Sequence, residues 1–178
     1  MTEDFLVQKR DAIVHDWFDR VVGTYPRETA RFLKSERDRF NNPVGRTTLE
    51  ALFELYDGLA AGEGPEALRG ALDRVIRIRS VQDFSPSQAV AFVFMLKDAV
   101  AGQSAGLAMG GQAPGGRSFS APEGDPDLRA LDARIDRAAL AAFDVYMGCR
   151  EQLRGIRENE IERRCRFQRT DRPGEDQP

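Results

Sequence analysis

The sequence predicts an all-α fold, a helical bundle with a long C-terminal helix, and three observations support it. Apolar residues recur at steps of three and four along most of the chain, which is the spacing of one helix face. No segment has the apolar and polar alternation of a half-buried strand. The chain has 178 residues, of which 41% are hydrophobic, so it is long enough for one ordinary domain with a real core and appendages.

The first predicted helix covers about residues 3–22 and is amphipathic. Gly23 and Pro26 end it, because glycine suits a helix end and the residue before a proline is biased out of the α region. A second, shorter helix is expected over 27–40. The apolar face of the first helix consists of Phe5, Leu6, Ile13, Val14, Trp17, Phe18, Val21 and Val22.

The next two helices are predicted from their start signals. Thr47 lies three residues before Glu50, the spacing at which a hydroxyl and a glutamate satisfy each other's free backbone amides, so a helix is expected over about 47–60. Pro65 suits the first position of a fourth helix. The residues expected to face the core there are Leu68, Leu72, Val75, Ile76 and Val81.

The stretch QDFSPSQAVAFVFMLK, residues 82–97, joins a polar turn to an apolar run. Ser85 is a natural N-cap, Pro86 needs no amide partner at the first helical position, and Gln88 completes a capping box with Ser85. Apolar side chains occupy every position around the helix over 89–96. The sequence therefore predicts one continuous, central, buried helix without a solvent face.

The C-terminal part is predicted to be a glycine-rich flexible loop over 102–124 followed by one long helix that starts at Pro126 and continues to about residue 169. Roughly 44 residues at about 1.5 Å each give about 65 Å, which exceeds the width of such a domain, so part of this helix must project or pair. A heptad-like seam favours dimerisation and comprises Leu128, Leu131, Ile135, Ala138, Ala142 and Val145.

Three segments follow from this organisation. Residues 1–149 are expected to form a helical domain, residues 150–169 a helical extension and residues 170–178 a disordered tail. The arginines of the extension could hold nucleic acid, anionic lipid or an acidic protein, but the glutamates between them favour a solvated helix. We therefore expect no nucleic acid among the partners.

The chain is expected to be cytoplasmic, with no integral membrane association. Its N-terminus lacks the pattern of a signal peptide, and no run of about 18 apolar residues occurs. Cys149 and Cys165 are the only cysteines, and sixteen positions along one helix are too many for a disulfide within the chain. The net charge of −3 identifies no partner by itself.

The inventory of chemically active side chains is small, so the sequence predicts no enzyme, no metal and no cofactor. His15 is the only histidine, and it is interpreted either as a surface residue or as a ligand or pH sensor. One histidine and two distant cysteines resemble none of the usual zinc spacings. A place on the first helix also differs from the late position of a globin's axial histidine, which disfavours haem.

The best polar constellation consists of Arg77, Arg79, Gln82 and Asp83. One interpretation is a site for a small anion or effector, because guanidinium groups suit negative charge. The other, which we prefer on the sequence alone, pairs Arg79 with Asp83 while Gln82 secures the turn. The candidate ligand or partner surface comprises His15, Trp17, Tyr25, Arg79, Gln82, Asp83, Ser85 and Gln88.

Several motifs resemble the N-terminal domain of the RsbT co-antagonist protein RsbRD, over about residues 5–148. They are Trp17, the Thr-Tyr-Pro turn at 24–26, Asn-Pro-Val-Gly at 42–45 and IRSVQDFSPSQA at 78–89. The resemblance implies a regulatory input domain, helical like a globin, often dimeric and generally without haem. It also implies a signal passed through the C-terminal helix, here to an output domain on a separate protein, because no STAS or kinase domain follows.

Two functional hypotheses follow. The first is a non-enzymatic signalling module that works as a homodimer and contacts a separate output protein. The alternative is a small-ligand sensor with a pocket inside the bundle, where Arg79, Gln82 or His15 orients the ligand. A small enzyme is a third and weaker possibility.

Overall fold

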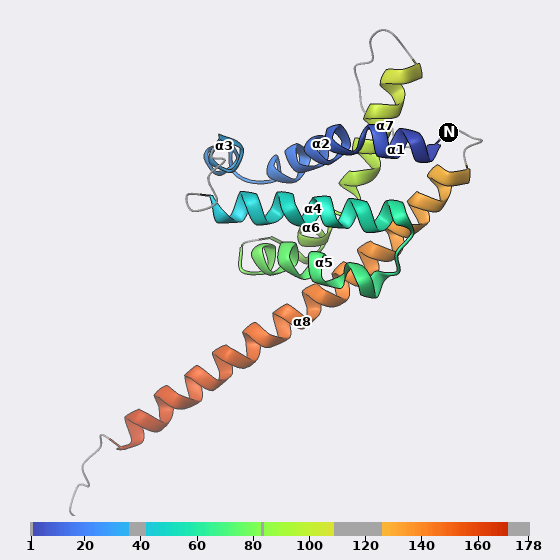
Figure 1. Ribbon diagram of the computed structural model, residues 1–178. Helices are drawn as coiled ribbons and strands as arrows, with labels where there is room; N and C mark the ends of the chain where they lie inside the picture. Colours follow the sequence, from blue (N-terminus) through green and yellow to red (C-terminus); the bar gives the residue numbers. More distant parts are fainter. Residues whose placement is uncertain (1, 36–41, 83, 109–125, 171–178) are drawn as a thin grey trace, which may run out of the picture.

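The computed structural model describes residues 2–35, 42–82, 84–108 and 126–170 (Figure 1). The regular elements in these ranges are all helices, so the predicted all-α class is confirmed. In chain order they are α1 (Thr2–Gln8), α2 (Arg10–Val22), α3 (Arg27–Ser35), α4 (Pro43–Ala61), α5 (Pro65–Ser80), α6 (Pro86–Val90), α7 (Met95–Ala108) and α8 (Pro126–Thr170).

The helices α2, α4, α5 and α8 lie side by side in this order. α2 packs on α4, α4 on α5, and α5 on the first half of α8, as Figure 1 shows. α7 covers α2 from another side, and the short α6 lies against α8. The core between them includes the fully buried side chains of Trp17, Leu52, Leu72, Phe92 and Ile135.

The first predicted helix is divided in two, because the chain leaves regular helical geometry at Lys9. At this break the carbonyl oxygen of Leu6 accepts a 2.9 Å hydrogen bond from the hydroxyl of Tyr56 on α4. Leu6 and the next apolar residues of the stripe, Ile13 and Val14, are still buried. The apolar spacing was therefore read correctly, whereas the break coincides with a contact from a residue fifty positions away.

The start of α4 was predicted at the wrong residue. Asn42 caps the helix, since its side-chain oxygen accepts a 2.9 Å hydrogen bond from the amide of Gly45. The same side chain donates to the carbonyl of Leu33 and so ties α4 to α3. Thr47 consequently lies inside the helix and not at its start. The predicted end of the preceding helix, residues 36–40, lies outside the described ranges.

α5 begins at Pro65, as predicted, after Gly62 ends α4 with a left-handed φ of 81°. Four of the five predicted core positions on α5 are buried, namely Leu68, Leu72, Val75 and Ile76. The fifth, Val81, is exposed because α5 has already ended at Ser80.

The predicted capping box at the start of α6 is confirmed in full. The hydroxyl of Ser85 accepts from the amide of Gln88, and the side-chain oxygen of Gln88 accepts from the amide of Ser85. The continuous helix expected over 89–96 is wrong, because α6 ends at Val90 and a tighter turn precedes α7. Phe94 on this turn is exposed, so the segment does have a solvent face.

The glycine-rich segment begins later than predicted. α7 continues through Ala108, so residues 102–108 are helical and not loop. The remainder of the predicted loop, residues 109–124, lies outside the described ranges, as does the predicted tail after Thr170.

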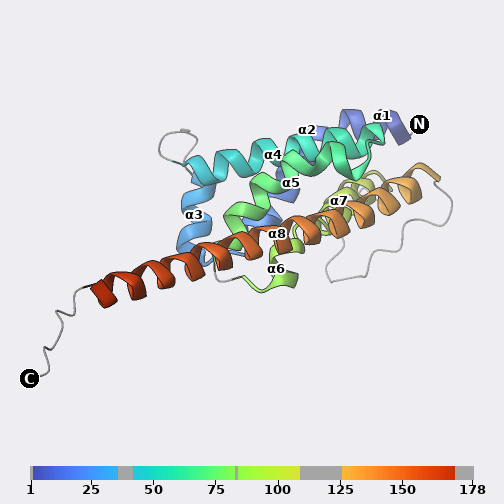
Figure 2. The same ribbon diagram turned by 90° about the horizontal axis from the view of Figure 1, so that it is seen from below.

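α8 is one helix of 45 residues, as the sequence predicts. The predicted seam is buried within the chain itself, largely against α5, from Leu128 to Val145. It is therefore not available for a second copy, which corrects the reason given for a dimer. Beyond Cys149 the helix leaves the bundle, and Figure 2 shows it projecting toward the C-terminus.

Candidate functional site

The side chain of Arg79 is buried at the C-terminal end of α5, with 1% of its surface exposed. Its Nη2 donates to the carbonyl oxygen of Gln88, at 3.0 Å, and to the hydroxyl of Thr24, at 3.2 Å. These contacts join the end of α5 to the end of α2 and to α6. Three segments that are distant in the sequence therefore meet at one guanidinium group.

Two aromatic rings line the same guanidinium. The centroid of the Phe84 ring lies 4.1 Å from Cζ of Arg79, and the centroid of the Tyr25 ring lies 5.5 Å from it. Both distances allow a cation–π interaction. The rings contact each other edge to face, with centroids 5.2 Å apart. The cation thus lies against an apolar, aromatic wall instead of water.

Within the described part of the chain, Nε and Nη1 of Arg79 and the buried Oε1 of Gln82 have no hydrogen-bond partner. No carboxylate among these residues pairs with Arg79. Burial lowers the pKa of Arg79, while neighbouring Tyr25 acts in the opposite direction. Burial likewise raises the pKa of the Tyr25 phenol, against the effect of Arg79 and Gln82.

The Arg79 cluster, which we define as Thr24, Tyr25, Arg79, Gln82 and Phe84, also adjoins α8. Ser80 follows Arg79 and is buried beside the thiol of Cys149. Burial raises the pKa of that thiol, as does nearby Asp73, whereas Arg77 and Ser80 lower it. Cys149 is the last buried residue before α8 leaves the bundle, so the cluster lies near the base of the projecting helix.

The structure brings five of the predicted site residues together: Tyr25, Arg79, Gln82, Ser85 and Gln88. Asp83 lies outside the described residues, so its predicted pairing with Arg79 stays a prediction. The other two candidates lie elsewhere.

His15 is exposed, with its Nδ1 2.7 Å from the carbonyl oxygen of Asp11 and its ring edge against Phe53. Trp17 is a core residue, fully buried, and its indole donates to the carbonyl oxygen of Phe92. Neither of them contributes to the Arg79 cluster.

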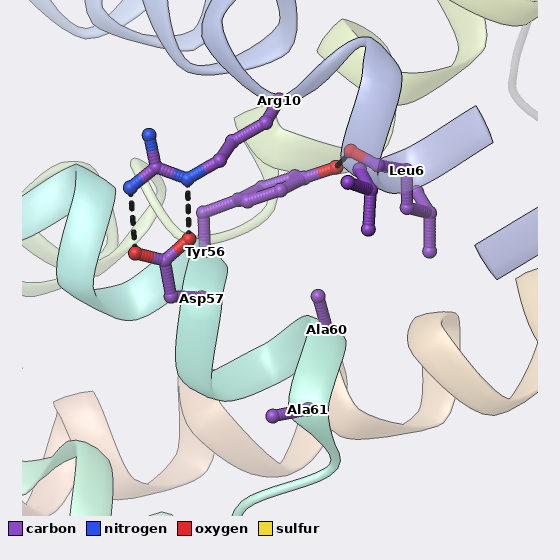
Figure 3. A pocket seen from close by; sticks show the side chains of 7 residues that line it. Leu6, Arg10, Tyr56, Asp57, Ala60 and Ala61 are labelled. Carbon is purple, nitrogen blue, oxygen red and sulfur yellow. Dashed lines mark hydrogen bonds and ion pairs between the residues drawn. The ribbon is translucent and has the colours of Figure 1, made fainter. Parts of the chain in front are cut away.

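A separate pocket of about 350 Å³ lies where the break between α1 and α2 faces α4. Figure 3 shows Arg10 and Asp57 paired at its edge, through two 2.6 Å hydrogen bonds, and Tyr56 reaching toward Leu6. The aspartate raises the pKa of Arg10, and burial raises the pKa of Tyr56 to about 12. Each polar group drawn in this pocket already has a partner, so the Arg79 cluster is the better candidate for a ligand.

The sequence reasoning missed an apolar surface on α8. Leu140, Phe143 and Met147 are 70%, 45% and 50% exposed, on the side of the helix that faces away from α5. We call these three residues the α8 patch. Lys97 of α7 reaches Asp136 on the same face, with 2.7 Å between its Nζ and the carboxylate. The signal was a second series of four- and three-residue steps, formed by Asp136, Leu140, Phe143, Met147 and Arg150.

The described ranges contain neither a candidate metal site nor a helix that could span a membrane. No group of three or more histidine, cysteine, aspartate or glutamate side chains there could hold a metal ion. No helix there combines the length and the hydropathy needed to cross a bilayer.

The chain matches the model of one protein family, described as the RsbT co-antagonist protein rsbRD N-terminal domain, over residues 11–161. The chain belongs to this family. The rsbRD N-terminal domain is a signalling-associated family, connected with partner switching, and is not a known enzyme family. The resemblance read from the turn and cap motifs is thus confirmed. No curated protein and no solved structure matched the chain.

Proposed function

We propose that this protein is a non-enzymatic signalling module that relays a signal through protein contacts made by α8. The observation that carries the proposal is the α8 patch, which exposes three large apolar side chains on one side of a helix whose other side is buried in the bundle. Exposed apolar clusters of this kind mark interaction surfaces. Membership of a signalling family, rather than an enzyme family, supports the same conclusion.

The occupant that suits the α8 patch is a second copy of the chain, in antiparallel orientation. A two-fold axis close to Phe143 would place Leu140 near Met147 and Asp136 near Arg150, because position 143 is midway between 136 and 150 and within one residue of the midpoint of 140 and 147. Opposite charges would then flank the apolar centre on both sides. A parallel pair would instead bring like charges together at both ends, which is unfavourable.

The projecting part of α8 suits a second, different contact. Residues 150–164 extend beyond the bundle, and Ile156 and Ile161 are exposed there among arginines and glutamates. We assign this segment to the separate output protein. A change in the direction in which α8 leaves the bundle would then change the surface that this partner contacts.

Light scattering at tens of micromolar protein tests the dimer. The expected result is twice the mass of the 19.9 kDa chain, and a strict monomer would contradict it. Capture of a partner by the intact chain, but not by a chain with Ile156→Asp and Ile161→Asp, tests the second contact. Capture by both proteins alike would argue against the assignment of residues 150–164.

A second candidate function, a sensor for a small ligand, is supported by the Arg79 cluster. Buried polar groups without partners are rare, and here two guanidinium nitrogens and one amide oxygen lie in one cluster. The cluster adjoins Ser80, which lies beside Cys149 at the base of the projecting helix. Binding of a ligand in the cluster could therefore be transmitted to α8.

A further inference from the structure

Among the described residues, no negative group compensates the positive charge of Arg79 in the interior of the protein. A guanidinium stays protonated at any physiological pH, and its burial is costly unless a negative group neutralises it. The described residues supply the hydroxyls of Thr24 and Tyr25, a carbonyl oxygen and two aromatic rings, none of which bears a full negative charge. A bound anion would remove this cost.

We propose that Arg79 binds a small organic monocarboxylate with a short apolar tail. This inference rests on the second candidate function and names its ligand class. One carboxylate charge balances one guanidinium, whereas a phosphate group carries about −1.5 to −2 at neutral pH and would leave the interior negative. The N–H groups on Nε and Nη1 have no hydrogen-bond partner in the part of the chain that the structure describes, and they can donate hydrogen bonds to carboxylate oxygens.

The neighbours of Arg79 fit the rest of such a ligand. The carboxamide of Gln82 can turn its amino end toward the carboxylate, since its buried oxygen makes no hydrogen bond in the present orientation. The phenol of Tyr25 lies beside both residues and is a further donor. The rings of Tyr25 and Phe84 offer apolar contact to a short hydrocarbon tail.

The competing interpretation is that Arg79 only holds three segments together. In that case the hydrogen bonds to Thr24 and Gln88, the phenol of Tyr25 and the two rings suffice for Arg79, and no carboxylate would stabilise the protein. Asp83 offers a third possibility, because it is four residues from Arg79 in the sequence and could neutralise it. An experiment must separate these three interpretations.

Thermal melting of the full chain with sodium propionate or sodium benzoate provides the test. Propionamide and benzamide serve as neutral isosteres, and sodium chloride and sodium phosphate at equal ionic strength control for salt. At about a hundredfold excess over Kd, one of the carboxylates should raise Tm by roughly 5–10 °C. No rise with either carboxylate, or an equal rise with its amide or with phosphate, would overturn the proposal.

Four variants attribute the effect to Arg79. Arg79→Met should abolish the carboxylate response, whereas Arg77→Met, at the exposed arginine two positions earlier, should keep it. If Arg79→Met does not fold, Arg79→Lys should weaken binding at least tenfold, because lysine lacks the planar set of donors. Asp83→Asn should respond like the wild type. A response that appears only in Asp83→Asn would show that Asp83 is the counter-ion and would refute the proposal.

The melting experiment tests the carboxylate site independently of whether the protein forms a dimer. A protein that is monomeric by light scattering but gains stability from propionate would contradict the homodimer and support the carboxylate site. A dimer without any carboxylate response would support the first proposed function and refute this inference.

Discussion

The indole Nε1 of Trp17 donates a 2.6 Å hydrogen bond to the carbonyl oxygen of Phe92, 75 residues further along the chain. The bond reaches the turn between α6 and α7, where most backbone amides pair three residues back instead of four. Leu96, for example, pairs with Val93, so the Phe92 carbonyl is left for the indole. The two rings also stack, with centroids 6.4 Å apart and 13° between their planes.

Replacing Trp17 with phenylalanine should destabilise the protein by roughly 2–3 kcal/mol. The change leaves a buried carbonyl without a donor and removes part of a buried ring. Urea unfolding measures the loss. Phe92→Leu is the matched control, because it keeps the backbone acceptor and should cost only about 1 kcal/mol. Equal losses in both variants would mean that packing, and not the hydrogen bond, is what Trp17 contributes.

Replacing Ser85 with alanine should cost about 1 kcal/mol through loss of the cap on α6. Ser87→Ala is the control, because Ser87 has no role in the two capping hydrogen bonds between Ser85 and Gln88. Denaturant midpoints of the three proteins give the comparison. A loss as large in Ser87→Ala would show that the hydroxyl contact between Ser85 and Ser87 matters more than the cap.

Tyr56 should make the protein less stable as the pH rises from about 10 to 12. Burial raises its folded-state pKa to about 12, above the unfolded value of 10.0, so this contribution is complete below pH 10. Above pH 10 the unfolded phenol ionises first, and stability falls by roughly 1.4 kcal/mol by pH 11. Tyr56→Phe lacks this pH-dependent contribution to stability. The advantage of the wild type over Tyr56→Phe in unfolding free energy, about 1 kcal/mol at pH 8, should therefore disappear by about pH 11, and a constant difference would contradict the assignment.

Tyr56→Phe should also be less stable than the wild type at pH 8, by about 1 kcal/mol, because the hydrogen bond to the Leu6 carbonyl is lost. This second number comes from the same unfolding curves. Equal stability at pH 8 would mean that the bond to Leu6 contributes nothing to the position of α1.

Cysteine cross-linking should reveal the antiparallel orientation of the dimer. In a background of Cys149→Ser and Cys165→Ser, a mixture of Leu140→Cys and Met147→Cys chains should form mixed disulfide dimers at least tenfold faster than either variant forms with itself. Faster self-linking of Leu140→Cys would indicate a parallel pair. Ile156→Cys is the control, because it lies outside the α8 patch.

A charge on the α8 patch should separate association from folding. Leu140→Glu combined with Met147→Glu should weaken the dimer at least a hundredfold, because four carboxylates would enter one interface. The unfolding free energy of the monomer should change by only about 0.5 kcal/mol, since both side chains are exposed. Dissociation constants from analytical ultracentrifugation test this, and unchanged values would exclude the patch as the interface.

Local signals in the sequence determined much of this protein. The capping box of Ser85 and Gln88, the opening prolines Pro65 and Pro86, and the apolar faces of α2 and α5 all depend on residues within one or two turns, so the sequence predicts them. The family resemblance relied on the capping-box segment and on other motifs that are equally local, such as the turn at 24–26. For the candidate site, the sequence placed Arg79 and Gln82 in one turn and Tyr25 among the candidates.

Only the tertiary structure decided the features that depend on distant partners. The break at Lys9 coincides with the hydrogen bond from Tyr56, and the turn after Val90 with the one from Trp17. The seam of α8 is filled by α5, which left the opposite face exposed. Arg79 could have formed a solvent-exposed ion pair with a neighbour in the sequence. It is instead a buried cation without a counter-ion among the described residues, because Thr24, Tyr25 and Phe84 cover it. Burial and charge compensation are properties of the packed molecule, and a local pattern does not specify them.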